Sequence, residues 1–263
     1  MKQHKSSLLF ELRPNGVDFV SYLFGTMHAR SEEAFKYYKL AESYLEKCQI
    51  FSGEINLNEG VNDTEHFYFE EGRDISYFLS QKQFEKLSKN ISKYYNLNLN
   101  DIKRFKPMII QNMLLESSSS KSFAQPLDMQ LKLKAEEWGM EITGVETFNE
   151  QKDIFNSIKM ETQLKGLLKM ASNIHKTNNN FKKLVKHYQA ADHLALYSST
   201  KRSLGSLRRP LLFDRNIIMA DRIFEQVCSN NVFVAIGAAH MGGSKGVLRY
   251  LTKKGIKIRA IID

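Results

Sequence analysis

The chain has 263 residues, of which 42% are hydrophobic and 11% aromatic, so it can build a hydrophobic core in one large domain or two small ones. Its formal net charge of +9 favours acidic partners, but the basic residues are scattered and no motif of alternating basic and aromatic residues indicates nucleic-acid binding. No segment approaches the roughly 20 apolar residues that span a bilayer, and the N-terminus lacks the apolar core of a signal peptide. We therefore expect a soluble cytoplasmic protein with no membrane span. Its two cysteines cannot form a disulfide framework, and we expect each to be a buried free thiol.

The N-terminal part of the chain predicts a strand, a loop, a helix and a second strand. The strands are residues 19–24 and 50–57, and the helix is residues 31–48. Between the first strand and the helix lies a Gly-x-x-His motif, formed by Gly25 and His28. The motif therefore follows directly after a predicted strand.

The middle of the chain is mostly helical by its apolar periodicity. One further strand is predicted at 140–146, and polar loops are predicted at 116–122 and 175–180. The densest basic patch lies at 201–210. Helices are predicted at 74–95, 108–117, 127–138, 148–170 and 181–197.

The C-terminal part repeats the N-terminal plan. A helix at 211–227 leads into a strand at 231–237, which ends in a second Gly-x-x-His motif. A helix at 247–255 and a strand at 256–262 follow. The pattern predicts an α/β fold, in which two similar βαβ-containing halves form a central sheet with a long, mostly helical insertion between them. We place the core at 8–60, 140–146 and 211–263, and the insertion at about 61–210.

The two motif histidines, His28 and His240, each fall just past the end of a predicted strand. In open α/β sheets, ligands bind in the crevice beyond the carboxyl ends of the strands. A single histidine at such a place is more often structural. Because two occur in the same local context, we predict that both imidazoles face one crevice if their strands are neighbours.

Two carboxylates occupy comparable places. Glu54 lies inside the second apolar run, and Glu146 ends the strand predicted at 140–146. Each could equally lie on the surface at a strand edge. Alternatively, a carboxylate in an apolar run is paired or binds a metal. Two imidazoles and one or two carboxylates would suit a divalent ion such as zinc or manganese.

The helix at 211–227 brings Arg215 towards the second motif, and Arg215, Met219 and Arg222 share one face of it. The alternative for Arg215 is an exposed arginine in a surface ion pair. The common zinc-protease motif His-Glu-x-x-His is absent from the sequence.

Taken together, these segments resemble the TraB/GumN family, which is grouped with the Tiki metalloproteases and related to the erythromycin-esterase and ChaN-like folds. The resemblance runs over nearly the whole chain. It is carried by YLFGTMHA, GEINL, FKPMII, LDMQLKLKAEEWGMEITGVETFNEQ, LLFDRNIIMADRI and VFVAIGAAHMGGSKGVLRYLTKKG. The paired Gly-x-x-His motifs together with the Arg-Asn pair of the helix are the specific part.

The resemblance implies a divalent metal site, with manganese, cobalt or zinc as the ion. It implies His28, His240 and Glu54 as metal ligands. We also predict Glu54, Glu146 and Arg215 as catalytic residues, and Gly25, Gly237 and Asn216 as substrate-binding residues. The histidines and Glu54 follow from the motif match, and Glu146 and Arg215 are their expected companions.

We therefore predict a metal-dependent hydrolase, most similar to a peptidase, that acts on a peptide or small-molecule substrate through water activated by the ion. A glutamate would be ligand or general base, and Arg215 would stabilise negative charge. Three alternatives stay open. The protein could sequester a peptide or small ligand without turnover, carry haem or a metal, or bind nucleic acid through its positive charge. The sequence carries no signal for an oligomeric state.

Overall fold

The computed structural model describes residues 6–56, 65–117 and 122–262. The chain divides into two compact units. The sheet unit consists of Met1–Glu59, Lys121–Glu150 and Leu184–Asp263, and the helical unit consists of Gly60–Ser120 and Gln151–Lys183. Among the helices described, none is long and apolar enough to span a bilayer.

A six-stranded mixed sheet forms the centre of the sheet unit, in the order β4-β3-β5-β2-β1-β6. β2, β3, β4 and β5 are parallel, whereas β1 pairs antiparallel with both β2 and β6. The mixed α/β class predicted from the sequence is confirmed. The strands are β1 (Leu9–Arg13), β2 (Ser21–Thr26), β3 (Ile50–Ile55), β4 (Glu141–Glu146), β5 (Val232–Gly237) and β6 (Lys257–Ile261).

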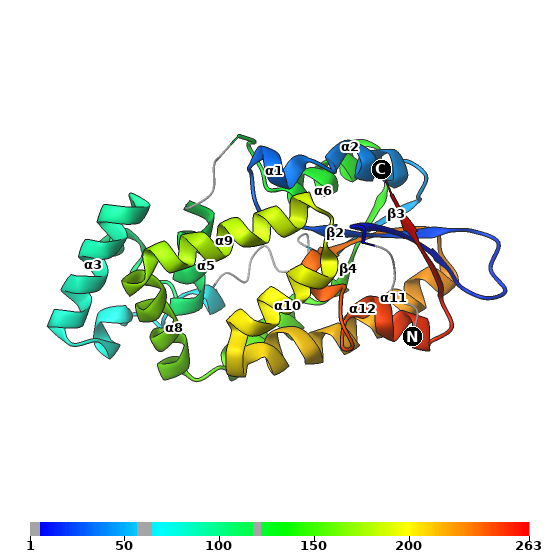
Figure 1. Ribbon diagram of the computed structural model, residues 1–263. Helices are drawn as coiled ribbons and strands as arrows, with labels where there is room; N and C mark the ends of the chain where they lie inside the picture. Colours follow the sequence, from blue (N-terminus) through cyan, green and yellow to red (C-terminus); the bar gives the residue numbers. More distant parts are fainter. Residues whose placement is uncertain (1–5, 57–64, 118–121, 263) are drawn as a thin grey trace. The chain divides into compact units, whose positions relative to one another are not determined.

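Helices cover both faces of this sheet (Figure 1). α1, α2 and α6 lie on one face, and α11 and α12 lie on the other. Covered on both sides, β2 and β5 consist almost entirely of buried residues, as expected for parallel strands inside an α/β sheet. The helices of this unit are α1 (Glu32–Phe35), α2 (Tyr38–Leu45), α6 (Leu127–Glu137), α10 (His193–Leu204), α11 (Arg215–Ser229) and α12 (Val247–Lys253), with short turns η3 (Gly205–Leu207), η4 (Arg209–Asp214) and η5 (Ala238–His240).

The helical unit has its own hydrophobic core. Leu87, Ile91, Ile110, Leu114 and Leu167 are all buried in it. Two helices, α7 (Phe148–Ser157) and α9 (Ile174–Gln189), contain residues of both units. The elements within the helical unit are η1 (Glu65–Phe67), η2 (Ile75–Phe78), α3 (Gln81–Tyr95), α4 (Leu99–Ile102), α5 (Pro107–Ser117) and α8 (Met160–Ser172).

Several local expectations differ from the structure. The polar loop predicted at 175–180 is wrong, because this segment is helical within α9. Strand β1 was not predicted at all, and the helix predicted at 31–48 is two helices separated at Lys36 and Tyr37. Residue 57 of the predicted strand, residues 118–121 of the predicted loop and the segment 57–64 at the predicted core boundary lie outside the described residues.

Candidate functional site

The carboxyl ends of the four parallel strands place the two motif histidines and the two glutamates at one edge of the sheet. β2 and β5 are direct neighbours, with Thr26 opposite Gly237, so the strands that precede His28 and His240 lie side by side. β3 and β4 end together in the same way, with Ile55 opposite Glu146. The condition on which the shared crevice depends, that the two motif strands are neighbours, is therefore met.

Arg215 joins the two carboxylates of this edge. Its Nε donates hydrogen bonds to Oε1 and Oε2 of Glu146 at 3.0 and 3.1 Å, and its Nη2 donates to Oε2 of Glu146 at 2.6 Å. Nη2 also forms an ion pair with Oε1 of Glu54. The Arg215 side chain is only 12% exposed and that of Glu146 is 0% exposed. Arg215 is therefore an internal bridge between carboxylates rather than a surface arginine.

Helix α11, which carries Arg215, is also fixed to β4 and to the residues after it by Arg222. Arg222 Nη1 donates to the Val145 carbonyl at 3.1 Å and to Glu150 at 2.9 Å. Met219, between the two arginines on the same face, is fully buried. The shared face predicted for this helix is confirmed. The helix follows a π-helical turn, η4, which is a type of irregularity often found beside functional sites.

Glu54 is held from a second direction by the backbone after β5. The Gly237 amide donates to its Oε2 at 3.1 Å. A Cβ at position 237 would lie 3.3 Å from this oxygen and 3.4 Å from Cδ2 of His240, so glycine allows both side chains to approach. Burial alone would raise the pKa of Glu54, but the charge and hydrogen bonds of Arg215, with the Gly237 amide, lower it to about 2. Glu54 is therefore ionised across the physiological range.

His240 is oriented by Asn216. The Asn216 Nδ2 group donates to the Lys245 carbonyl at 2.6 Å, which fixes the orientation of the amide. Asn216 Oδ1 then faces Nδ1 of His240 at 2.6 Å and accepts its hydrogen. The imidazole proton is thereby assigned to Nδ1, and Nε2 carries the lone pair.

The electrostatic surroundings keep the His240 ring neutral. Burial and the positive charge of Arg215 lower its pKa to about 4, against a smaller opposing effect of the Glu54 carboxylate. A neutral imidazole with a fixed tautomer is the form of histidine that ligates metals.

His28 has a similar partner in a different environment. Its Nδ1 lies 2.9 and 3.0 Å from the carboxylate oxygens of Asp128, in the first turn of α6. Its side chain is 65% exposed, whereas His240 is buried. In both motifs an oxygen acceptor faces Nδ1, an arrangement that is usual for histidines that ligate a metal through Nε2.

The residues predicted to bind substrate have further roles inside the fold. Asn216 is fully buried, and both ends of its amide are used by His240 and Lys245. Gly25 is buried, its carbonyl accepts a hydrogen bond from the Tyr188 hydroxyl at 3.0 Å, and its amide donates to the Leu8 carbonyl at 2.7 Å. The geometry thus gives Asn216 and Gly25 positioning and packing roles, and their substrate contacts stay predictions.

The three residues predicted as metal ligands are of types that divalent ions bind. Two imidazoles with oriented Nδ1 atoms and one ionised carboxylate, Glu54, are ligands suited to zinc, manganese or cobalt. Within residues 6–56, 65–117 and 122–262, no three His, Cys, Asp or Glu side chains are already grouped closely enough to hold an ion. The fit therefore rests on donor type and orientation.

Sequence reasoning missed Asp128 and the Lys245 carbonyl. Asp128 lies 100 residues from His28, and its only local signal is an acidic residue in the first turn of a helix. The Lys245 carbonyl is a backbone group, so its residue type carries no signal. Asp128 orients His28 directly, and the Lys245 carbonyl orients His240 through Asn216; spacing along the chain reveals neither role.

Comparison with known proteins identifies the family of this chain. The family model described as TraB/PrgY/gumN family matches residues 8–260. No curated protein and no solved structure gave a significant match. Since the match covers nearly the whole chain, including both Gly-x-x-His motifs and the Arg-Asn helix, the protein belongs to the TraB/PrgY/gumN family.

Proposed function

We propose that this protein is a metal-dependent hydrolase of the peptidase type. The observation that carries the proposal is the pair of Gly-x-x-His imidazoles at the ends of two neighbouring parallel strands. Each has its Nδ1 facing an oxygen acceptor, Asp128 for His28 and Asn216 for His240. An oxygen acceptor at Nδ1 is usual for metal-ligating histidines, and ligands of open α/β sheets bind beyond the carboxyl ends of the strands.

In this proposal, Nε2 of His28, Nε2 of His240 and the carboxylate of Glu54 hold the ion. A divalent ion there supplies Lewis acidity, which makes water a nucleophile at neutral pH. The pKa of about 2 makes Glu54 a weak general base near neutral pH and favours its role as an anionic ligand.

Glu146 completes the site as a positioning residue, and Arg215 both positions Glu54 and contacts the substrate. Arg215 fixes the carboxylate of Glu54 by using Glu146 as its second anchor. Its Nη1 group makes no hydrogen bond within the described part of the chain, so it remains as a donor for the carbonyl oxygen of a substrate. Preorganised donors of this kind typically contribute about 2.7–4 kcal/mol to transition-state stabilisation.

Metal-linked stability tests the proposal without knowledge of the substrate. Manganese, cobalt or zinc should raise the melting temperature of chelator-stripped protein. At a hundredfold excess of the ion over its dissociation constant, the free energy of unfolding should rise by about 2.7 kcal/mol. The double variant His28→Ala/His240→Ala should lose this response. The matched control, His175→Ala/His187→Ala, removes two histidines of α9 and should keep it.

Turnover is measured on the same proteins with a peptide library, with and without chelator. Cleavage that requires added metal and is lost in the His28→Ala/His240→Ala variant supports a hydrolase. A metal response without cleavage of any peptide would instead favour the binding or carrier alternatives. An equal metal response in the double variant and the parent would refute the proposed ion site.

A further inference from the structure

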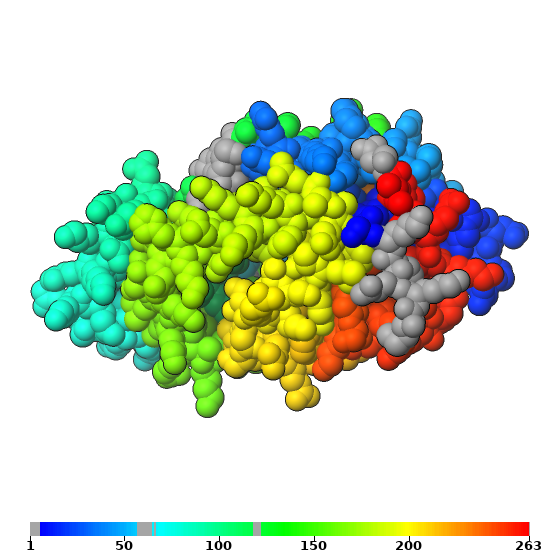
Figure 2. Space-filling view, viewed as in Figure 1, coloured from blue at the N-terminus to red at the C-terminus, as the bar shows by residue number. Residues whose placement is uncertain are grey.

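A small hollow on the surface of the sheet unit, with a volume of about 320 Å³, is not used by the proposed chemistry. Its walls come from α10, from the segment before α11 and from the loop after η5. On the face shown in Figure 2, α10 (yellow) and the segment after β5 (orange) adjoin. The hollow is lined by Tyr197, Lys201, Arg208, Phe213, Ser244 and Lys245.

The lining is cationic and has no acidic member. Lys201 and Arg208 belong to the densest basic patch of the sequence, and Lys245 joins them from a distant segment. In the part of the chain that the structure describes, none of these three cations forms an ion pair with a carboxylate. Three like charges around one hollow repel one another, and a bound anion relieves that repulsion.

Two aromatic rings form a firm wall beside these charges. Tyr197 and Phe213 stack with their centroids 6.5 Å apart. The Nζ atom of Lys245 lies 4.5 Å from the Phe213 centroid, and that of Lys201 lies 5.4 Å from the Tyr197 centroid. A Cβ at Gly243 would lie 2.2 Å from the Tyr197 ring, so this ring packs directly on the glycine backbone. The hollow thus offers cationic groups together with a fixed apolar surface.

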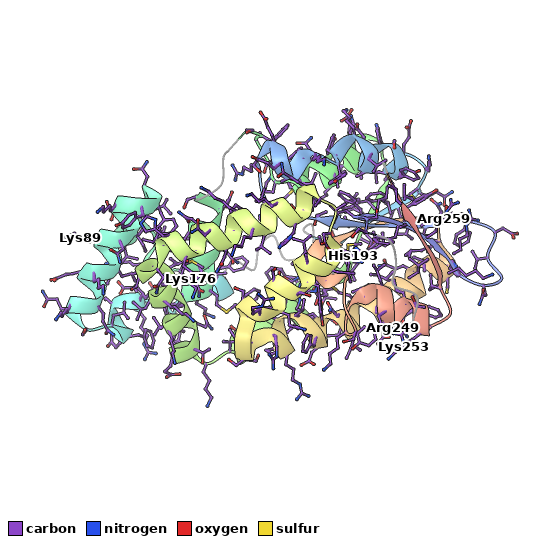
Figure 3. All side chains as sticks on the ribbon, in the orientation of Figure 1. Lys89, Lys176, His193, Arg249, Lys253 and Arg259 are labelled. Atoms are coloured by element: carbon purple, nitrogen blue, oxygen red, sulfur yellow. The ribbon has the colours of Figure 1, made fainter. Side chains whose placement is uncertain are left out.

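The hollow is connected to the candidate site through one residue. The carbonyl of Lys245 accepts the hydrogen bond that fixes Asn216, and Asn216 orients His240. His193, labelled in Figure 3, begins α10 on the other side of this loop, and a Cβ at Gly242 would lie 2.6 Å from its carbonyl oxygen. The loop that carries Ser244 and Lys245 is therefore held between α10 and the site.

We propose that this hollow is a specificity subsite that binds an acidic side chain of a peptide substrate. The proposal rests on the proposed peptidase function for the identity of the ligand as a peptide. Lys201, Arg208 and Lys245 bind the carboxylate, and the rings of Tyr197 and Phe213 contact the apolar part of the same residue or of its neighbour.

Equilibrium binding tests the subsite without any turnover. The probes are two fluorescein-labelled pools of random nonapeptides, one with Glu and one with Gln at the central position, measured by fluorescence anisotropy at low salt. We expect the parent protein to bind the Glu pool about tenfold more tightly than the Gln pool, since charge-assisted hydrogen bonds are stronger than neutral ones. The difference should shrink as salt is added.

Two triple variants, each lacking three positive charges, separate the hollow from the general charge of the protein. Lys201→Gln/Arg208→Gln/Lys245→Gln should bind both pools equally. Arg202→Gln/Lys253→Gln/Lys257→Gln changes exposed residues of α10, α12 and β6 outside the hollow and should keep the preference; Lys253 is labelled in Figure 3.

Equal binding of the two pools by the parent, or an unchanged preference in the first variant, would overturn the subsite. Competition by inorganic phosphate without any preference between the pools would also overturn it, because the hollow would then take a free anion. A preference for the Glu pool in a protein that cleaves no peptide would refute the hydrolase and leave the hollow as a binding site for acidic peptides.

Discussion

The two Gly-x-x-His motifs occupy equivalent places in the sheet but very different environments. His240 is buried, faces a neutral amide and lies in the field of Arg215, whereas His28 is 65% exposed and faces a carboxylate. The Gly-x-x-His motif therefore specifies that the histidine follows the end of a strand, but it does not specify the electrostatic environment of the imidazole ring. The difference comes from partners on other elements, and removing those partners one at a time tests how much each histidine depends on them.

The largest expected effect comes from Arg215, which makes the two environments unequal. Arg215→Met should lower the free energy of unfolding by about 3–5 kcal/mol, because it leaves the buried carboxylate of Glu146 without its cation. Chemical denaturation measures the loss. Adding Glu146→Gln should recover part of it, since the buried charge is then removed as well.

The matched control lies on the same helix. Arg222→Met breaks an ion pair with Glu150 whose side chains are 33% and 31% exposed, so its cost should be about 1 kcal/mol or less. Arg215→Lys should fall between the two, because an ammonium keeps the charge but cannot bridge two carboxylates in the same way. Equal losses for Arg215→Met and Arg222→Met would show that the bridge at the site is not a buried interaction.

The second prediction concerns acid stability. Since the pKa of His240 is lowered from 6.5 to about 4, the unfolded chain binds a proton more readily than the folded chain between these values. The free energy of unfolding should therefore fall by about 3 kcal/mol as the pH drops from 6.5 to 4. Glu54 acts in the same direction at lower pH, between 4.5 and about 2. Above about pH 8 neither group should contribute a slope.

His240→Gln measures this contribution, because glutamine does not titrate. The stability of this variant should depend on pH less steeply than that of the parent, by up to about 1.36 kcal/mol per pH unit between pH 6.5 and 4. Denaturation curves at several pH values provide the slopes. If His28→Gln reduces the pH dependence of the free energy of unfolding between pH 6.5 and 4 as much as His240→Gln does, the two environments are not as different as the structure indicates.

The part of the site that could be predicted is the part set by strand pattern. Apolar runs that end in Gly-x-x-His placed His28 and His240 at strand ends, and helical periodicity placed Arg215 and Met219 on one face. Asp128 could not be predicted, because it reaches His28 from 100 residues away. Contacts of that range depend on how helices pack on the sheet, which local pattern does not encode.

The missed elements have a similar cause. The asparagine run 178–180 has low helix propensity, yet it lies inside α9 because buried side chains hold the helix on both sides of the run. Ile174 is 7% exposed and Tyr188 is fully buried, so tertiary packing overrides the local preference. In the same way β1 is fixed by pairing with β2 and β6 rather than by a turn signal of its own.

The third prediction concerns Asn216 and Asp128, the residues that face Nδ1 of His240 and of His28. Asn216→Ala should cost about 1–3 kcal/mol, because it leaves the buried Nδ1 of His240 and the Lys245 carbonyl without their hydrogen bonds. Asp128→Ala should cost about 1 kcal/mol or less, since the His28 pair is exposed. Nitrogen-15 NMR of the imidazoles should also show that His240 loses its fixed tautomer in Asn216→Ala. An unchanged tautomer would mean that Asn216 does not orient the ring.

The smallest expected effect on stability belongs to His28→Ala, and it makes the sharpest comparison of the two motifs. The ring is mostly exposed, so removing it should change the free energy of unfolding of the metal-free protein by no more than about 0.5 kcal/mol. His240→Ala should cost more, because it leaves Oδ1 of the buried Asn216 without a partner. In the proposed function, however, both rings ligate the same ion, so each single variant should lose most of the rise in melting temperature that manganese produces in the parent. The two histidines should thus differ in what they contribute to the fold and agree in what they contribute to metal binding. A manganese response in His28→Ala equal to that of the parent would show that the ion is held without this histidine, and the symmetry of the two motifs would then be one of structure alone.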